Sequence, residues 1–359
     1  MCLAGAAIPP VRRVRINHSA VVQVFLAAAA CRRKPVGSAI SSRHRPAGRS
    51  TAALDPSAPI PAVGAREACP CGSGRRYKAC HGRESARASE MVSLRPFAGL
   101  ASETDWVALR EIVPAATAPL TLRDPAHADR EVLLATVLPM GCAAMVRADR
   151  SIFLGLQVSA HSGDVSRDAA FALEQALVAP AGTPIAATGL PGAGPSLQDL
   201  VTDDPLVVTV LDGFTFWVEG VPVLEPEVEA SLERANSVVI PTAAVPGATS
   251  AYWCRMPERN HLRWVLPYDE DTLLDAMARL MPAGGLSLGE GTKYVGSFRA
   301  HGLLVPVWDL PSSVEADSLE QPVADLQVRL DEALADEAPL TADQRRSRGA
   351  LAGRQLTIR

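Results

Sequence analysis

The pattern of apolar and polar positions predicts regular structure from about residue 103 onward. Residues 105–113 (DWVALREIV) place apolar side chains at helical spacing. Residues 226–235 (PEVEASLERA) form a second such segment, with acidic residues in the first turn, where a helix N-terminus favours them. Pro/Ala-rich, strand-like sequence follows each segment. The chain therefore predicts a helix leading into extended structure at two separate places.

Two β-hairpins are predicted after these segments, because short apolar runs flank polar turns at residues 148–150 and 257–260. The predicted strand pairs are 142–147 with 152–158, and 252–255 with 262–266. Each hairpin is followed by an acidic residue and a helical pattern, at residues 168–177 and 271–280, that ends near Pro-Ala-Gly. The last predicted strands are 206–210 with 214–218, and 294–298 with 303–308.

The shared order of elements predicts an α+β fold with antiparallel strands, built as a tandem pseudo-repeat of two α+β units. The first unit is predicted at residues 91–220 and the second at residues 221–312. Chance matching between Ala-rich segments is the alternative to a duplication.

Residues 313–359 are predicted to form an acidic helix and an arginine-rich C-terminal tail. Between residues 315 and 337 there are eight acidic residues and one basic residue, which is typical of a solvated helix. Thr341 and Gln344 form a capping-box pair at the start of the tail. The tail carries Arg345, Arg346, Arg348, Arg354 and Arg359. We expect this basic tail to dock onto the acidic helix, with nucleic-acid binding as the alternative.

Residues 1–65 show no sustained helical or strand period and are predicted to be a disordered basic segment. An incorrect translation start would also explain this segment. The apolar run at residues 20–31 is shorter than the roughly 20 residues of a membrane span. It has some features of a secretory signal, with Cys31 at a lipoprotein-like position, but a thiolate metal site downstream argues against export. We therefore expect a cytoplasmic protein without a membrane segment.

The formal net charge of −4 hides a division of charge along the chain. Residues 1–90 contain fifteen Lys/Arg and four Asp/Glu, whereas residues 91–359 contain twenty Lys/Arg and thirty-five Asp/Glu. A basic front segment can bind an anionic partner, and it can equally rest on its own acidic body.

Four metal-ligand residues lie close together near the start of the recognisable sequence: Cys69, Cys71, Cys80 and His81. Zinc prefers four nitrogen or sulfur ligands in a tetrahedron, and a structural site fills all four positions with protein atoms. Gly72 and Gly74 permit the tight backbone that would fold the two ligand pairs around one ion. The sequence predicts a small structural zinc knuckle at residues 66–84. An accidental grouping of ligand-type residues in a flexible segment is the alternative.

The segment CPCGSGRRYKACHG resembles the SEC-C motif, the zinc-binding C-terminal tail of the bacterial SecA preprotein translocase. The resemblance implies that Cys69, Cys71, Cys80 and His81 bind one structural Zn²⁺. In the translocase the basic loop of this motif contacts a chaperone and the ribosome. By resemblance only, the partner-binding residues of this chain would be Arg75, Arg76 and Lys78. No helicase motor accompanies the motif, so translocase activity is not implied.

The rest of the chain also resembles a family. Stretches such as DWVALREIVPAATAPL, HLRWVLPYDEDTLLDAMARL and GSFRAHGLLVPVWDLP are similar to an uncharacterised actinobacterial family in which a SEC-C motif precedes a domain of unknown function. The resemblance implies an architecture and no activity.

Other candidate motifs are better explained by structure. The glycines of residues 189–194 and 289–293 lack the context of a phosphate loop. The carboxylates of residues 269–271 could hold Mg²⁺, but they stand where a helix N-terminus favours negative charge. Four isolated histidines, at positions 127, 161, 261 and 301, have no catalytic motif around them. The five tryptophans, at positions 106, 217, 253, 264 and 308, have apolar neighbours, which favours core packing over base stacking.

The sequence thus predicts a non-catalytic binding or adaptor protein that contacts a ribosome, a chaperone or another protein through its basic knuckle. The alternative is an enzyme with an unrecognised site between the two α+β units, the knuckle serving as a localising tag. A third hypothesis is nucleic-acid binding by the knuckle and the arginine tail together. No small-molecule substrate is indicated.

Overall fold

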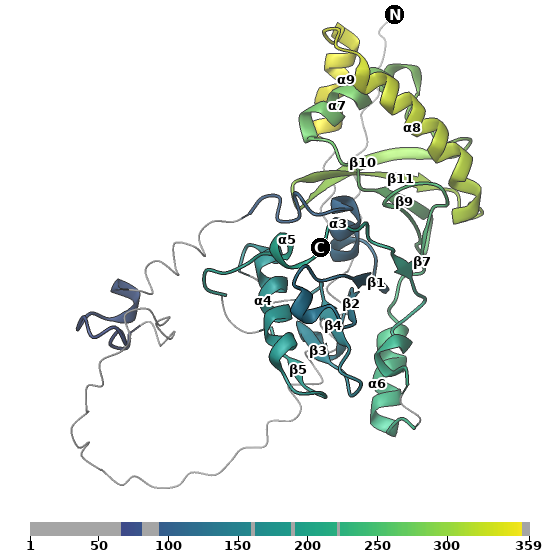
Figure 1. Cartoon of the computed structure of the whole chain (residues 1–359). Coiled ribbons are helices and arrows are strands. Elements are labelled where there is room, and N and C mark those ends of the chain that lie inside the picture. The colour runs from purple at the N-terminus through teal and green to yellow at the C-terminus, as the bar shows by residue number, and fades with distance from the viewer. Residues whose placement is uncertain (1–65, 81–92, 159–161, 188–190, 221–222, 354–359) are drawn as a thin grey trace, which may run out of the picture.

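The computed structural model describes residues 66–80, 93–158, 162–187, 191–220 and 223–353 (Figure 1). The predicted disordered segment 1–65 lies outside this part of the chain, as do residues 81–84 of the predicted knuckle and residues 354–359 of the predicted tail. The described part combines helices with two β-sheets, and most neighbouring strands are antiparallel, which confirms the predicted α+β class. The predicted domain boundaries stay predictions.

The first sheet has six strands in the order β5-β3-β4-β2-β1-β6. Its strands are β1 (Ala116–Leu120), β2 (Val132–Ala135), β3 (Ala144–Val146), β4 (Ile152–Gly155), β5 (Pro184–Ile185) and β6 (Thr209–Val210). β2 and β4 pair in parallel, and the other neighbours are antiparallel. All four residues of β4 are buried, as expected for a continuous apolar run in the middle of a sheet.

Helix α4 (Val165–Val178) packs against β3, β4 and β5. The Asp164 carboxylate caps it by accepting a hydrogen bond from the Arg167 backbone N–H. Leu173 and several small alanines form its buried face, so the helix can approach the sheet closely. Short elements complete this unit: α3 (Glu103–Glu111), α5 (Leu197–Leu200), and the 3-10 turns η2 (Pro125–His127), η3 (Pro139–Gly141) and η4 (Thr215–Val218).

The second sheet has five strands, all antiparallel, in the order β10-β11-β9-β8-β7. Its strands are β7 (Thr242–Ala244), β8 (Ala251–Arg255), β9 (Asn260–Trp264), β10 (Lys293–Ala300) and β11 (Leu303–Leu310). The long hairpin of β10 and β11 turns at His301 and Gly302, both with positive φ. Gly302 also lies so close to the chain at Leu94 that a Cβ would be 2.8 Å from the Leu94 carbonyl oxygen.

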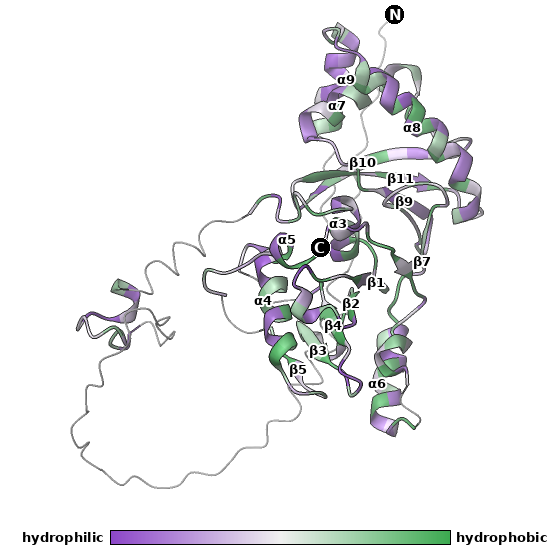
Figure 2. Cartoon of the chain, viewed as in Figure 1, coloured by the Kyte–Doolittle hydropathy of each residue, from purple (hydrophilic) through white to green (hydrophobic). Residues whose placement is uncertain are grey.

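Three helices cover one face of the second sheet (Figure 1). They are α7 (Glu270–Leu280), α8 (Glu320–Ala335) and α9 (Ala342–Gly353), with the 3-10 turns η5 (Met281–Ala283) and η6 (Ala316–Leu319) between strands and helices. Figure 2 shows both hydrophilic and hydrophobic residues on these helices. The apolar side chains of Leu274, Leu326 and Leu351, one from each helix, belong to the buried cluster on this face. A further helix, α6 (Pro226–Asn236), joins the two units and buries only Ala235.

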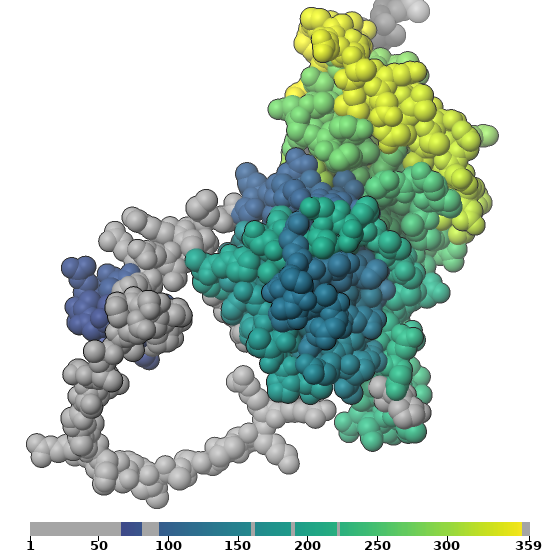
Figure 3. Space-filling view, viewed as in Figure 1, coloured from purple at the N-terminus to yellow at the C-terminus, as the bar shows by residue number. Residues whose placement is uncertain are grey.

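The two sheets share one hydrophobic cluster, and α3 lies between them (Figure 1). The space-filling view shows the two units in direct contact (Figure 3). Trp106 and Ile112 from the first unit belong to this cluster together with Phe298 and Val305 from the second sheet. The units are therefore packed against each other through a common apolar core.

Most predicted elements are confirmed, including both central hairpins and the helices that follow them. The predicted strand 214–218 is wrong, because residues 215–218 form a 3-10 turn. From this turn, the adjacent Phe216 and Trp217 both pack into the same buried cluster. Trp217 stacks on Phe214 with ring centroids 4.5 Å apart and donates its Nε1–H to the Val137 carbonyl.

Nothing in the structure confirms the predicted duplication, which stays a prediction. The strand orders of the two sheets differ. In the first sheet, the strand after the helix, β5, pairs with the first strand of the hairpin, β3. In the second sheet, the strand after the helix is β10, which pairs with β11. Strand β11 in turn pairs with the second strand of the hairpin, β9.

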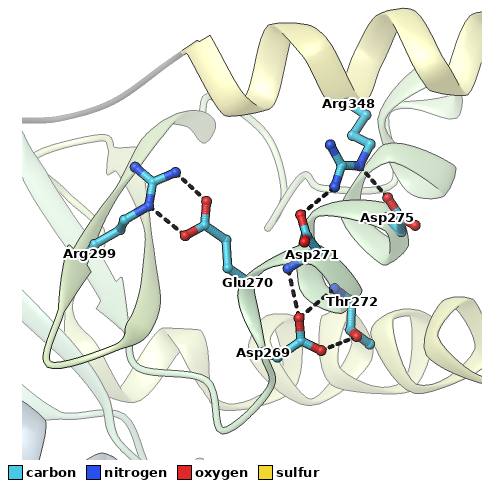
Figure 4. Close-up of polar contacts among 7 residues, drawn as sticks. All are labelled: Asp269, Glu270, Asp271, Thr272, Asp275, Arg299 and Arg348. Carbon is cyan, nitrogen blue, oxygen red and sulfur yellow. Dashed lines mark hydrogen bonds and ion pairs between the residues drawn. The ribbon is translucent and has the colours of Figure 1, made fainter. Parts of the chain in front are cut away.

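The arginine-rich tail docks at a different place from the one expected. The predicted capping box of α9 is confirmed, because Thr341 and Gln344 exchange hydrogen bonds. Arg348 of α9 then pairs with Asp271 and Asp275 of α7, not with the acidic helix α8 (Figure 4).

Candidate metal centre

Three cysteine thiols form a cluster in the knuckle, at residues 66–80. The Sγ atoms of Cys69, Cys71 and Cys80 all lie within 4.8 Å of one another, and those of Cys71 and Cys80 are 3.5 Å apart. Within the described residues, this is the one group of three or more Cys, His, Asp or Glu side chains close enough to hold a metal ion. Three of the four predicted ligands are thus brought together.

The backbone of the knuckle explains this convergence. The Cys69 N–H donates to the Arg75 carbonyl and the Tyr77 N–H to the Glu67 carbonyl, so the chain turns back on itself after Cys71. Gly72 and Gly74 lie at the turn with φ of 78° and 70°, values that favour glycine. The 3-10 turn η1 (Tyr77–Ala79) then carries Cys80 back to the first two thiols.

Ser73 contributes to the electrostatics of the cluster. Its hydroxyl lies 3.2 Å from the Cys80 Sγ atom. Hydrogen bonds from the Ser73 side chain and backbone lower the pKa of Cys71 to about 6. A thiolate is the form that binds metal, so Cys71 is prepared for ligation near neutral pH. A hydroxyl two residues after a ligand cysteine is the sequence signal for this hydrogen-bonding role, which the sequence analysis missed.

The donor set fits a thiophilic metal ion. A structural zinc site has four protein ligands, which are cysteine thiolates alone or cysteine thiolates together with histidine, at Zn–S distances of about 2.3 Å. Three thiols within 4.8 Å of one another can meet such an ion with little movement. The fourth predicted ligand, His81, lies outside the described residues.

The basic residues of the knuckle face solvent. Arg75, Arg76 and Lys78 are all exposed, whereas Tyr77 is half-buried between them. Cys69 is the one buried side chain among residues 66–80. The loop therefore presents positive charge at its surface, and its role as a contact surface stays a prediction.

The carboxylates of residues 269–271 all have partners in the protein, and Asp269 caps a helix as expected (Figure 4). Asp269 accepts hydrogen bonds from the backbone N–H groups of Asp271 and Thr272. The Thr272 hydroxyl contributes most to the lowered pKa of Asp269. Glu270 pairs with Arg299 of β10, whose hydrogen bonds lower the pKa of Glu270. Capping and ion pairing therefore explain this acidic group without a bound cation.

Two of the isolated histidines acquire carboxylate partners in the fold. The Nε2 atom of His261 is 3.3 Å from Asp309 Oδ1, and that of His301 is 2.9 Å from Glu111 Oε1. His127 is half-buried in η2, and His161 lies outside the described residues. The sequence missed both pairs, because only cross-strand register and packing between the units bring these residues together.

Cys254, His261 and Asp309 are direct neighbours across β8, β9 and β11. This row has the residue types of a nucleophilic triad, but Cys254 is only 1% exposed. Burial raises the pKa of its thiol, and a buried neutral thiol is a poor nucleophile. The row is better explained as part of the packed interior.

All five tryptophans are buried, which confirms their predicted place in the core. Each donates its indole N–H to a backbone carbonyl, so the polar atom of every ring is satisfied. The acceptors for Trp106, Trp217, Trp253, Trp264 and Trp308 are Ala101, Val137, Val314, Thr249 and Leu286.

Comparison with known proteins gives two family matches. Residues 66–83 match the SEC-C motif, and residues 96–359 match a family of unknown function (DUF5926). No curated protein and no solved structure matches the chain. None of the helices in the described part combines the length and apolarity that a membrane crossing requires.

Proposed function

The chain belongs to the family of unknown function DUF5926 and carries a SEC-C motif in front of that domain, and from this premise we propose that it is a zinc-binding adaptor protein. In this proposal the knuckle holds one structural Zn²⁺ through Cys69, Cys71, Cys80 and His81. Its basic loop binds a protein partner, such as a ribosome or a chaperone, while the body acts as a separate folded unit in the cytoplasm.

The observation that carries the proposal is the thiol cluster beneath an exposed basic loop. Three thiolates and one imidazole would leave no open coordination position, so the ion would shape the loop and would not activate water. The exposed loop can then form ion pairs with acidic groups on a partner through Arg75, Arg76 and Lys78.

The lack of disulfides among the described residues supports a reducing compartment. Among the described residues, no cysteine is part of a disulfide; these cysteines are Cys69, Cys71, Cys80, Cys142 and Cys254. Cytosolic proteins keep thiols reduced, and spaced ligand cysteines in such proteins favour metal binding over disulfides.

The proposal is tested by capturing partners from a cytosolic extract with the full chain. Three forms are compared: wild type, Cys80→Ser in the knuckle, and Cys142→Ser, which changes a buried thiol of the body as a matched control. Metal content is measured on each protein before capture. We expect zinc at one ion per chain in wild type and Cys142→Ser, and less in Cys80→Ser.

Ribosomal or chaperone components should bind only the two zinc-containing forms. A variant carrying Arg75→Glu, Arg76→Glu and Lys78→Glu should keep its zinc and lose the partner. Equal recovery of partners by all forms would show that the knuckle is not the contact surface.

A further inference from the structure

A groove lies between α3, the second sheet and α8. Its volume is about 550 Å³, within the range of small-molecule sites. Most of its lining is apolar or aromatic, including Trp264, Leu266, Pro267, Tyr268 and Val323. Thr104 and Thr249 add hydroxyl groups. The groove joins elements from both units, a common position for a binding site.

One acidic residue of α8, Asp331, lines the groove, and a second, Glu320, lies next to the lining residue Gly247. Asp331 accepts hydrogen bonds from Gln327 Nε2, at 2.6 Å, and from the Tyr268 hydroxyl, at 3.4 Å. Glu320 lies close to Gly247, which lines the groove. A Cβ atom built on this glycine would lie 3.6 Å from Glu320 Oε1. The two carboxylates are eleven residues apart on one helix, or about 16 Å at a rise of about 1.5 Å per residue.

No basic side chain in the lining offsets this charge. The lining contains no Lys, Arg or His. The one basic residue of α8, Arg329, donates to the carbonyls of Gly285 and Ser287, neither of which lines the groove. Burial, with a further contribution from the Asp331 charge, raises the pKa of Tyr268. The groove is therefore apolar in its middle and anionic toward its ends.

We propose that this groove binds a long linear aliphatic diamine, with its terminal ammonium groups at Asp331 and Glu320 and its alkyl chain against the apolar and aromatic lining. About 13 single bonds of about 1.5 Å, advancing in a zigzag, span about the distance between the two carboxylates. An ammonium group near the Tyr268 ring gains a cation–π contribution. This site is independent of the metal knuckle.

The charge requirement is tested by calorimetric titration of the full chain with 1,12-diaminododecane at low salt. Asp331→Asn and Glu320→Gln should each weaken binding by about two- to fivefold, as expected for exposed ion pairs. The matched control is Asp325→Asn, which removes the same charge from an α8 residue outside the lining and should leave affinity unchanged. An equal loss in the control would mean general attraction to an acidic surface and would overturn the proposal.

The position of the site is tested by filling the groove. Ala324 is an exposed lining residue, so Ala324→Trp should block binding of the diamine without changing the melting temperature. Val328→Trp, at an exposed α8 position outside the lining, is the control and should bind normally. Binding that survives Ala324→Trp would refute the site. Equally strong competition by Mg²⁺ at the same concentration of charge would also refute it, because it would mean general attraction of cations to an acidic surface.

Discussion

The knuckle and the body are held together by different forces. Among residues 66–80 only the Cys69 side chain is buried, so this segment has almost no apolar core. The body, by contrast, buries three hydrophobic clusters, one of which joins both sheets. A very small unit needs a metal or a disulfide in place of a core, whereas a large unit does not. The two regions should therefore respond independently to changes in metal, packing, charge and pH.

The largest expected effect is loss of the metal from the knuckle. Structural zinc sites bind with apparent free energies of about 10–16 kcal/mol near neutral pH, and without metal such small units unfold. Cys71→Ser or a strong chelator should release zinc and expose residues 66–80 to protease, while the main thermal transition stays in place. Metal analysis, limited proteolysis and calorimetry check this. A simultaneous fall in the melting temperature of the body would show that the two regions are coupled.

The converse test weakens the body alone. Trp106 is 1% exposed, stacks on Phe97 with centroids 5.9 Å apart, and belongs to the cluster shared by both sheets. Trp106→Ala should lower the free energy of unfolding by about 3–5 kcal/mol while zinc content is unchanged. The control Val328→Ala changes an exposed side chain and should shift stability by less than about 0.5 kcal/mol. Loss of zinc in the Trp106 variant would contradict independence.

A smaller effect is expected where α9 meets α7 (Figure 4). Arg348 pairs with Asp275 and, at 2.6 Å, with Asp271, and its side chain is 33% exposed. Arg348→Ala should lower stability by about 1 kcal/mol, and less at high salt, because exposed ion pairs are screened. Chemical unfolding at two salt concentrations measures this. Arg346→Ala, whose partner Asp343 is in the same helix, should have almost no effect.

The smallest effect concerns pH at the contact between the units. Burial raises the pKa of Asp105. The hydrogen bond that Ser250 Oγ donates to this carboxylate, at 2.5 Å, lowers the pKa by less than burial raises it. Protonated Asp105 therefore contributes to the free energy of unfolding. This contribution is fully present below the pKa of the unfolded chain, about 3.9, and is lost as pH rises through the higher pKa of the folded protein.

Asp105→Asn should therefore gain stability relative to wild type as pH rises from 4 to 7, which melting curves can follow. The knuckle should behave in the opposite way, because protonated thiols release metal as pH falls. A difference between wild type and Asp105→Asn that does not change with pH would contradict the assigned role of Asp105.

Local signals allowed much of the structure to be predicted. The capping of α7 by Asp269 and the pairing of Thr341 with Gln344 depend on residues two or three positions apart, so sequence spacing was sufficient. The error at residues 214–218 has a tertiary cause. Phe216 and Trp217 are both held in a core that includes Val137, and this packing overrides the local strand pattern.

The sequence by itself determined the candidate metal ligands and most of the helices and hairpins, because these depend on spacing and backbone preferences within about fifteen residues. Only the tertiary structure decided the contacts between distant residues: Arg348 with Asp271 and Asp275, His261 with Asp309, and the groove shared by Thr104, Trp264 and Asp331. The physical reason is that strand register and helix packing place these side chains. Both arise from the burial of the whole apolar core, which no single segment encodes.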